Sequence, residues 1–185
     1  MQSEQLIQTL LAQTKQITDQ AAQLERLDLN VLTWKQNENS WSILECLEHL
    51  NLYGDFYLPE IDRKIKSTNT KSDLEFKSGI LGNYFAKSML PKEHLNKMKT
   101  FKDKNPLNAK LDITVINRFI QQQNQLITLL NQSRKVSLNK VRIEISISKL
   151  IKLKLGDTFQ FFINHIIRHF KQIENIQAAI KTAAN

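Results

Sequence analysis

Residues 156–181 read GDTFQFFINHIIRHFKQIENIQAAIK, and this stretch decides the fold. Its apolar residues recur at the three- and four-residue spacing of one helix face. The middle of this apolar stripe is formed by Phe162, Ile166, Ile173 and Ile180. The run Gly156-Asp157-Thr158 predicts a break and a cap just before the helix. We therefore expect an amphipathic helix from Phe159 to Lys181 whose apolar face packs against other helices.

Two helices are predicted in the first third of the chain. Residues 3–27 place apolar side chains at spacings of three and four, as in an amphipathic helix. The pair Ser42-x-x-Glu45 has the spacing of a capping box, so a second helix should begin there. This helix should end near Pro59 or a turn beyond, because proline kinks or ends a helix. Its inward side chains are predicted to be Leu47, Leu50, Tyr53 and Tyr57.

Helical spacing resumes in the second half of the chain. Asp112 or Thr114 can cap a third helix, which is expected to end near Ser133. Residues 67–110 have no regular pattern apart from a short apolar stretch, Ile80 to Leu90, that predicts an extra helix in a long crossover. Residues 136–155 contain a strict alternation of apolar and polar residues that is typical of a strand.

The alternating stretch has no second strong strand to pair with, so we interpret it as an irregular extended connector before the last helix. Four long helices with two long connections are typical of a helix bundle. The sequence therefore predicts an all-α fold, an up-and-down four-helix bundle with a long crossover. At 185 residues, a single domain spanning residues 1–185 is expected.

Composition excludes several classes of protein. The single cysteine, Cys46, rules out an internal disulfide and a cysteine-rich zinc site. The first eleven residues follow a helical pattern that differs from a signal peptide, and no stretch approaches the roughly 20 apolar residues of a membrane span. We expect a cytoplasmic protein that does not bind a membrane.

The net charge of +8 raises the question of nucleic-acid binding. Residues 62–155 hold 20 basic and 7 acidic residues, so the positive charge is concentrated in the middle of the chain. Few aromatic residues are interleaved with these lysines, and no nucleic-acid-binding motif is recognisable. A solvated lysine-rich surface is the preferred interpretation, with phosphate binding as the alternative.

Three of the four histidines fall in two of the predicted helices. His165 and His169 are four residues apart, so they lie one above the other on the same helix face. His49 lies on the inward or border face of the Ser42 helix. Three interior imidazoles can hold one divalent ion and leave positions open for water or substrate.

The alternative for each histidine is a hydrogen-bonded core residue. A buried imidazole needs partners for both ring nitrogens, and several of them close together repel one another when protonated. One shared cation satisfies all three, so a metal site formed by His49, His165 and His169 is the preferred hypothesis.

Three short motifs carry a family resemblance. They are Trp41-Ser42-x-x-Glu45-x-x-x-His49-Leu50, Lys154-Leu155-Gly156-Asp157, and Phe162-x-x-His165-x-x-Arg168-His169-x-x-Gln172. In their order and spacing the chain resembles the DinB-like family of bacterial proteins over nearly its whole length. The resemblance implies a bundle with a long crossover, frequent homodimers, and nickel, zinc or a similar ion on the residues that match His49, His165 and His169. It also implies kinship with thiol-dependent transferases and metal-dependent hydrolases.

The preferred function is a metal-dependent enzyme that acts on a small molecule through a metal-bound water or thiol, with a low-molecular-weight thiol as one candidate substrate. The alternative is a non-enzymatic metal-binding or dimerisation module. No residue outside the three histidines is assigned a catalytic role.

Several other residues are candidates for a role near the site. His94 is expected on the surface, with ligation as the lesser alternative, and Cys46 is expected to pack in the core, although it could be a ligand or nucleophile. Trp34 and Trp41 are expected to fasten the first helix to the second. Residues that could orient an imidazole through its other nitrogen are Glu48, Asn164, Arg168 and Gln172.

Overall fold

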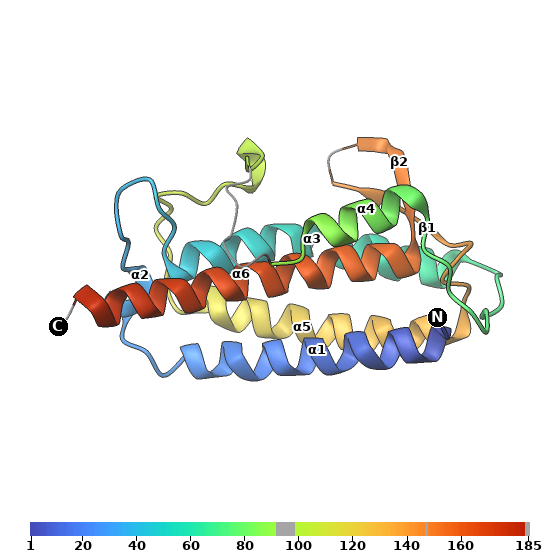
Figure 1. Cartoon of the computed structure of the whole chain (residues 1–185), viewed down its shortest axis with the longest axis horizontal. Helices are drawn as coiled ribbons and strands as arrows, with labels where there is room; N and C mark the ends of the chain where they lie inside the picture. The colour runs from blue at the N-terminus through green and yellow to red at the C-terminus, as the bar shows by residue number, and fades with distance from the viewer. Residues whose placement is uncertain (92–98, 147, 184–185) are drawn as a thin grey trace.

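The chain is mostly helical, as the sequence predicts. A computed structural model describes residues 1–91, 99–146 and 148–183, and four long helices run along its long axis (Figure 1). They are α1 (Ser3–Leu24), α3 (Ile43–Ser67), α5 (Thr114–Gln132) and α6 (Leu155–Ala183). α1 and α6 run in one direction, whereas α3 and α5 run in the other (Figure 1).

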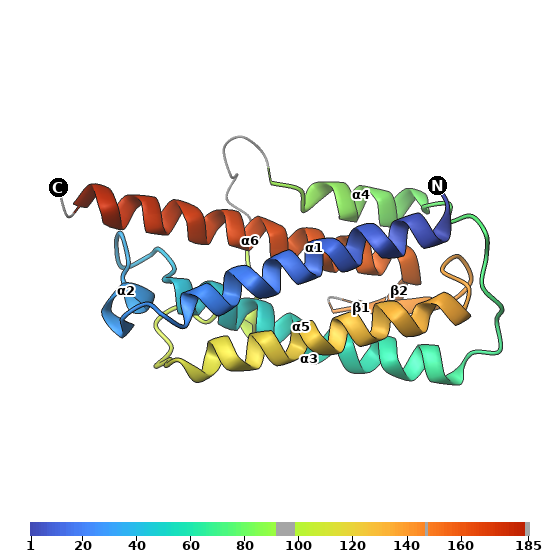
Figure 2. The same cartoon turned by 90° about the horizontal axis from the view of Figure 1, so that it is seen from below.

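The four long helices surround one apolar core. α1 contacts α5 and α6, and α3 contacts the same two helices (Figure 2). The largest fully buried side chains come from α3, α5 and α6 and from a short helix, α2 (Leu29–Thr33). Among them are Tyr57, Phe119, Phe159, Phe162 and Leu32. Burial of these apolar side chains removes their surface from water, which is the main stabilising contribution to the fold.

α3 begins as predicted but ends later. The side chain of Ser42 accepts a hydrogen bond from the backbone N–H of Glu45, and the Glu45 carboxylate accepts one from Ser42 N–H at 2.8 Å. The helix then continues through Pro59 to Ser67, so the expected end near Pro59 or one turn beyond is wrong. The buried residues Ile61 and Ile65 after the proline keep this last part of α3 against the core.

The crossover between α3 and α5 contains the predicted extra helix, α4 (Ile80–Ser88), which packs on α6. Its N-terminus is held by Asp157 of α6, whose carboxylate accepts hydrogen bonds from Ser78 and from Gly79 N–H. A Cβ atom at Gly82 would lie 2.2 Å from that carboxylate, so only glycine permits this close approach.

The predicted start of the last helix at Phe159 is wrong. α6 begins at Leu155, so Gly156, Asp157 and Thr158 lie within its first turn. Asp157 has the chemistry of a capping residue, but its side chain holds the neighbouring helix α4 and not its own. The preceding strand also runs directly into α6 without a break.

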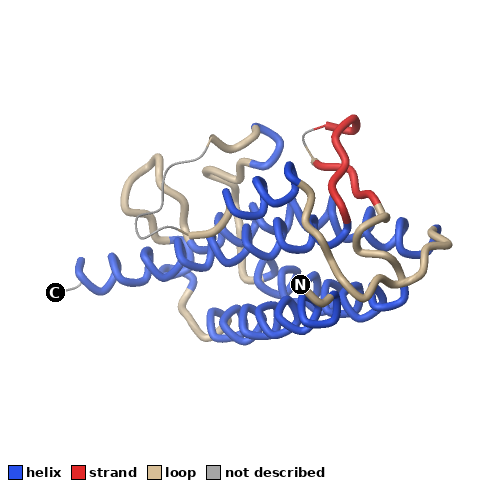
Figure 3. The backbone as a smooth tube through the Cα atoms, turned by 45° about the vertical axis from the view of Figure 1, so that its right-hand side comes forward, coloured by secondary structure: helices blue, strands red, loops and turns tan. Residues whose placement is uncertain are grey.

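The interpretation of residues 136–155 as an unpaired connector is also wrong. β1 (Arg142–Ile145) pairs antiparallel with β2 (Ser148–Lys154), and the resulting hairpin is the red segment of Figure 3. In the hairpin Ile143 lies opposite Leu153, and both side chains are buried. The sequence pattern of β2 is weaker than that of β1, because the adjacent apolar residues Leu150 and Ile151 interrupt its alternation. No helix among the described residues combines the length and the hydropathy needed to span a membrane.

Candidate metal centre

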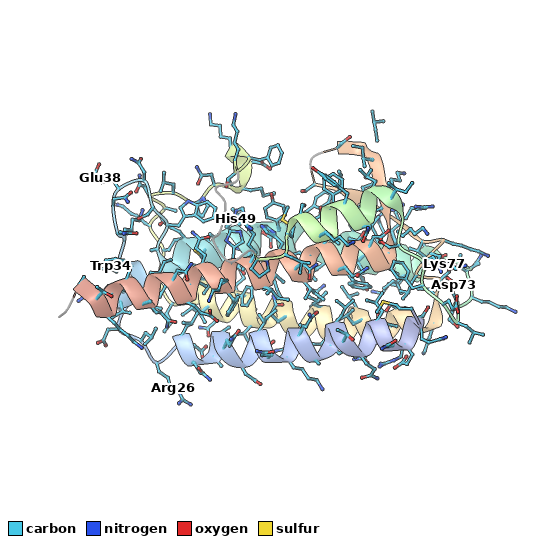
Figure 4. The ribbon with its side chains drawn as sticks, in the orientation of Figure 1. Arg26, Trp34, Glu38, His49, Asp73 and Lys77 are labelled. Atoms are coloured by element: carbon cyan, nitrogen blue, oxygen red, sulfur yellow. The ribbon has the colours of Figure 1, made fainter. Side chains whose placement is uncertain are left out.

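Three imidazoles converge between α3 and α6. Nε2 of His165 lies 3.2 Å from Nε2 of His49 and 3.0 Å from Nε2 of His169. All three side chains are buried, with exposed fractions of 3% for His49, 6% for His165 and 8% for His169. Figure 4 shows His49 beside α6, well away from Asp73 and Lys77 at one end of the molecule. The i, i+4 spacing in α6 therefore brings two rings to one point, as the sequence predicts.

The spacing of these nitrogens fits ligands of one ion. Two imidazole nitrogens that bind an ion at about 2.0–2.1 Å, with an angle of roughly 90–110° between them, are about 2.9–3.4 Å apart. The two separations that involve His165, 3.0 and 3.2 Å, fall in this range, and the ligand atoms of all three rings lie within 4.8 Å of one another. Among the histidine, cysteine, aspartate and glutamate side chains of the described residues, three lie close enough together to share an ion. They are His49, His165 and His169.

Hydrogen bonds on the outer side of two rings orient their inner nitrogens. Nδ1 of His49 lies 2.6 Å from the backbone carbonyl oxygen of Lys104, and Nδ1 of His169 lies 3.0 Å from Oε1 of Gln172. A carbonyl oxygen only accepts, so each Nδ1 carries the proton and each neutral ring presents an Nε2 lone pair to the cluster. Nδ1 of His165 is buried and has no hydrogen-bond partner among the described residues.

Burial keeps the three imidazoles neutral. It lowers the pKa of His49 to about 4 and the pKa of His169 to about 3, and it holds the pKa of His165 well below its ordinary value. The neighbouring rings add to the effect for His165 and His169, because two adjacent imidazolium ions repel each other. At neutral pH all three rings therefore keep the lone pairs that a metal ligand needs.

Aromatic side chains surround the histidines. The ring of Trp41 is 4.7 Å from that of His49 and is stacked 5.8 Å from that of His169. Tyr53, one turn after His49 on α3, has its ring 5.0 Å from His49 and 4.8 Å from His165. Trp41 thus has a role at the site beyond the expected fastening of two helices. Burial raises the pKa of Tyr53 to about 12, so its hydroxyl is a neutral donor at neutral pH.

A cleft of about 1010 Å³ opens onto the three histidines. It is lined by α3, α4 and α6, by the hairpin, by the segment around Trp34 to Trp41, and by the end of the crossover. A volume of this size accommodates a small molecule. The histidines are therefore buried against protein on their outer side, and a ligand in the cleft reaches them.

The four residues proposed to orient an imidazole behave differently. Gln172 contacts His169 as predicted. Glu48 instead accepts a hydrogen bond from Arg118 at 3.2 Å, and Asn164 donates one to the carbonyl of Ala86 at 2.9 Å. Arg168 is buried and lines the cleft. No sequence pattern identifies the Lys104 carbonyl as a partner of His49, because every residue has a backbone carbonyl group.

Of the two other candidate ligands, Cys46 is among the described residues. Cys46 is fully buried in the core, as expected, and burial raises the pKa of its thiol, so it stays protonated. His94 lies outside the described residues. Tyr53 shares a face of the helix with His49, one turn earlier, and this spacing predicts its place beside that ring; its contact with His165 of α6 has no such signal in the sequence.

The comparisons with known proteins agree with the motifs. A sequence model described as the DinB superfamily matches residues 10–173. No curated protein and no solved structure gives a significant match to the chain. The matched range covers most of the chain and contains His49, His165 and His169. The chain therefore belongs to the DinB superfamily.

Proposed function

We propose that this protein is a metal-dependent enzyme that acts on a small molecule, with nickel or zinc held by His49, His165 and His169. The observation that carries the proposal is the convergence of three neutral imidazoles beside a cleft of about 1010 Å³. Nε2 of His165 lies 3.2 Å from Nε2 of His49 and 3.0 Å from Nε2 of His169. A purely structural site closes all positions around its ion, whereas a catalytic site keeps one open. An adjoining cleft supports the second kind.

A divalent ion with three neutral ligands would supply Lewis-acid activation of a water or a thiol, as in a hydrolase or a thiol transferase. The chain contributes orientation and exclusion of water. The Lys104 carbonyl and Gln172 hold two imidazoles in the ligand tautomer, and the Trp41 ring covers the same two rings. Tyr53 packs beside His49 and lines the cleft, and its neutral hydroxyl is a hydrogen-bond donor for a ligand there.

The metal content of the purified protein tests the ligand set. We expect the native protein to retain about one nickel or zinc ion per chain and His49→Ala to retain far less. Asn175→Ala is the matched control, because Asn175 lines the same cleft and is an exposed residue of α6. Elemental analysis of all three proteins, prepared without an affinity tag, measures this. Equal metal content in native protein and His49→Ala would contradict the proposed ligands.

Turnover tests the enzymatic part. Low-molecular-weight thiols paired with electrophilic small molecules, and activated esters or amides, are suitable substrate panels. Activity that disappears with a chelator and returns with the ion is expected for an enzyme of this kind.

The alternative function is a non-enzymatic metal-binding or dimerisation module. The deep burial of all three rings, at 3–8% exposure, is the observation that favours it. In that case, stripping the ion lowers the melting temperature, because an ion that binds only the folded state stabilises it. A large melting shift with every substrate panel blank would therefore assign the ion to stability.

We also propose that residues 1–185 form a single four-helix-bundle domain, whose long crossover makes the consecutive long helices α3 and α5 parallel in place of the expected up-and-down order, and that the protein is a cytoplasmic homodimer. The single, buried Cys46 suits a reducing compartment, and superfamily membership is what suggests the dimer. Light scattering after size exclusion distinguishes a monomer of 21.6 kDa from a dimer of twice that mass.

A further inference from the structure

The carboxylate of Glu45 joins three segments that surround the candidate metal centre. Its Oε2 accepts the capping hydrogen bond from Ser42 N–H at 2.8 Å. Its Oε1 accepts two more, from the ammonium group of Lys35 at 2.7 Å and from Asn108 N–H at 2.6 Å. Glu45 is 2% exposed, so these charge-assisted bonds are shielded from water. The helix cap uses only one of the two carboxylate oxygens, so the other has a separate role.

The backbone of Asn108 is shaped to meet that second oxygen. Its φ of 64° lies in the left-handed region, which asparagine adopts more readily than most residues. It is the third residue of a turn closed by a hydrogen bond from Ala109 N–H to the Pro106 carbonyl. Its side chain accepts a hydrogen bond from Lys35 at 2.9 Å. Lys35, Glu45 and Asn108 therefore contact one another pairwise, and we name these three residues the Glu45 clamp.

The Glu45 clamp lies one helical turn from a proposed metal ligand. Glu45 and His49 are four residues apart on α3, and Lys104 and Asn108 are four residues apart on the crossover. The crossover thus contacts α3 at Glu45 through Asn108 N–H and at His49 through the Lys104 carbonyl, 2.6 Å from Nδ1. Only three residues separate these two points of the crossover, so a fixed Asn108 limits where the Lys104 carbonyl can lie.

The position of this carbonyl decides which nitrogen of His49 carries the proton. With the carbonyl in place, Nδ1 donates to it and Nε2 keeps the lone pair that a metal ion needs. Without the carbonyl, Nε2 can carry the proton and donate it to Nε2 of His165, 3.2 Å away. A protonated Nε2 has no lone pair for an ion, so loss of the carbonyl contact weakens metal binding.

We infer that Glu45 is a positioning residue of the metal centre. It holds the end of the crossover so that the Lys104 carbonyl selects the ligand tautomer of His49. Lys35 supports it, because its ammonium group contacts both Glu45 and Asn108. The inference rests on the proposed function, since it takes His49 as a ligand of the ion.

Two variants separate the Glu45 clamp from the helix cap. Glu45→Gln keeps a capping residue, but its amide has one acceptor oxygen in place of two and no charge to pair with Lys35. Lys35→Met removes the ammonium group and leaves both residues of the cap in place. We expect Glu45→Gln to weaken zinc binding about tenfold, as for loss of a partner of a metal ligand. Lys35→Met should weaken it about two- to fivefold, as for loss of a partly exposed ion pair.

Lys66→Met is the matched control. It breaks another lysine–carboxylate pair of α3, between Lys66 and Asp62, with the same N–O distance of 2.7 Å. This pair lies near the other end of the helix, so zinc affinity should not change. Competition for zinc with a chromophoric chelator measures the affinity of all four proteins.

The tautomer of His49 in the metal-free protein is the decisive measurement, because a merely structural role of Glu45 does not change it. Long-range proton–nitrogen correlation spectra of chelator-treated protein distinguish a ring protonated at Nδ1 from one protonated at Nε2. The signals of His49 are those missing from His49→Ala. Native protein and Lys66→Met should show His49 protonated at Nδ1, whereas Glu45→Gln and Lys35→Met should show a mixture of both forms.

The inference is overturned if His49 stays protonated at Nδ1 alone in Glu45→Gln and Lys35→Met, whatever their affinity for zinc. If Glu45→Gln does not fold, Lys35→Met decides by the same measurement. The outcomes for the two proposals are distinguishable, because the tautomer is measured without an ion. A protein whose His49 tautomer depends on the Glu45 clamp, but which takes up no zinc, refutes only the proposed function.

Discussion

The contact between α1 and α5 and the contact between α3 and α6 differ in the chemistry of their side chains. The first is largely apolar, with Leu10 and Ile17 of α1 and Phe119 and Leu126 of α5 buried. The second contains the three imidazoles and, at its edge, the buried Arg168. Apolar side chains need only to fill space, whereas each buried polar group needs a particular partner. The fold therefore tolerates substitution differently on its two sides.

Acid should expose this difference most strongly in the metal-free protein. The imidazole pKa values in the fold lie at about 4 for His49, at about 3 for His169 and well below 6.5 for His165, whereas an unfolded histidine titrates near 6.5. Below about pH 6.5 the unfolded chain binds more protons, so stability falls as the pH falls. Each such group lowers the free energy of unfolding by about 1.4 kcal/mol per pH unit at most. The three groups together lower it by up to about 4 kcal/mol per pH unit.

Chelator-treated protein unfolded in urea at several pH values between about 6.5 and 5 measures this slope. His165→Phe removes one of the groups and fills its space with an apolar ring, so its slope should be smaller. A stability that is flat across this range would show that the buried imidazoles do not resist protonation.

The apolar contact between α1 and α5 is best tested by a substitution at Phe119. This α5 residue is fully buried and its ring lies 5.6 Å from that of Phe170. Phe119→Ala leaves a cavity, and we expect the free energy of unfolding to fall by about 3–5 kcal/mol. Urea denaturation measures it, with the exposed neighbour Gln121→Ala as a control that should change stability by less than about 0.5 kcal/mol. The folded fraction should bind metal as the native protein does, since Phe119 is not part of the cluster.

The features that the sequence predicts are those set by local spacing, whereas long-range contacts between polar groups are harder to predict. Helical spacing alone identified the long helices, and the four-residue interval from His165 to His169 placed both rings on one face. Both are local patterns that the chain repeats every turn. The long-range contact between α6 and His49 follows from a different requirement. Buried imidazoles need partners for their ring nitrogens, and one shared ion supplies a partner to all three.

The errors arose where local pattern and tertiary contact disagree. Asp157 has a capping residue's chemistry but holds the start of α4, as its hydrogen bond from Gly79 N–H, 78 residues earlier in the chain, shows. β1 alternates clearly, whereas the adjacent apolar residues Leu150 and Ile151 interrupt the alternation in its partner strand β2. The Lys104 carbonyl that orients His49 has no sequence signature at all, because the backbone is the same at every residue.

The smallest expected effect concerns Gln172, and it separates orientation from ligation. Gln172 is expected to act on the proposed ion through His169, because the amide oxygen of Gln172 lies 3.0 Å from Nδ1 of His169. Loss of such a partner costs about 10–100-fold in metal affinity, because the ring loses its fixed tautomer and orientation. Gln172→Ala should therefore weaken metal binding by that amount and leave the stoichiometry at saturation unchanged. Competition with a chromophoric chelator measures the affinity, and Asn175→Ala controls for a change in the cleft wall. If Gln172→Ala lowered the saturating stoichiometry as His49→Ala is expected to do, Gln172 would belong to the ligand set; if it changed nothing, the hydrogen bond would not orient the ring.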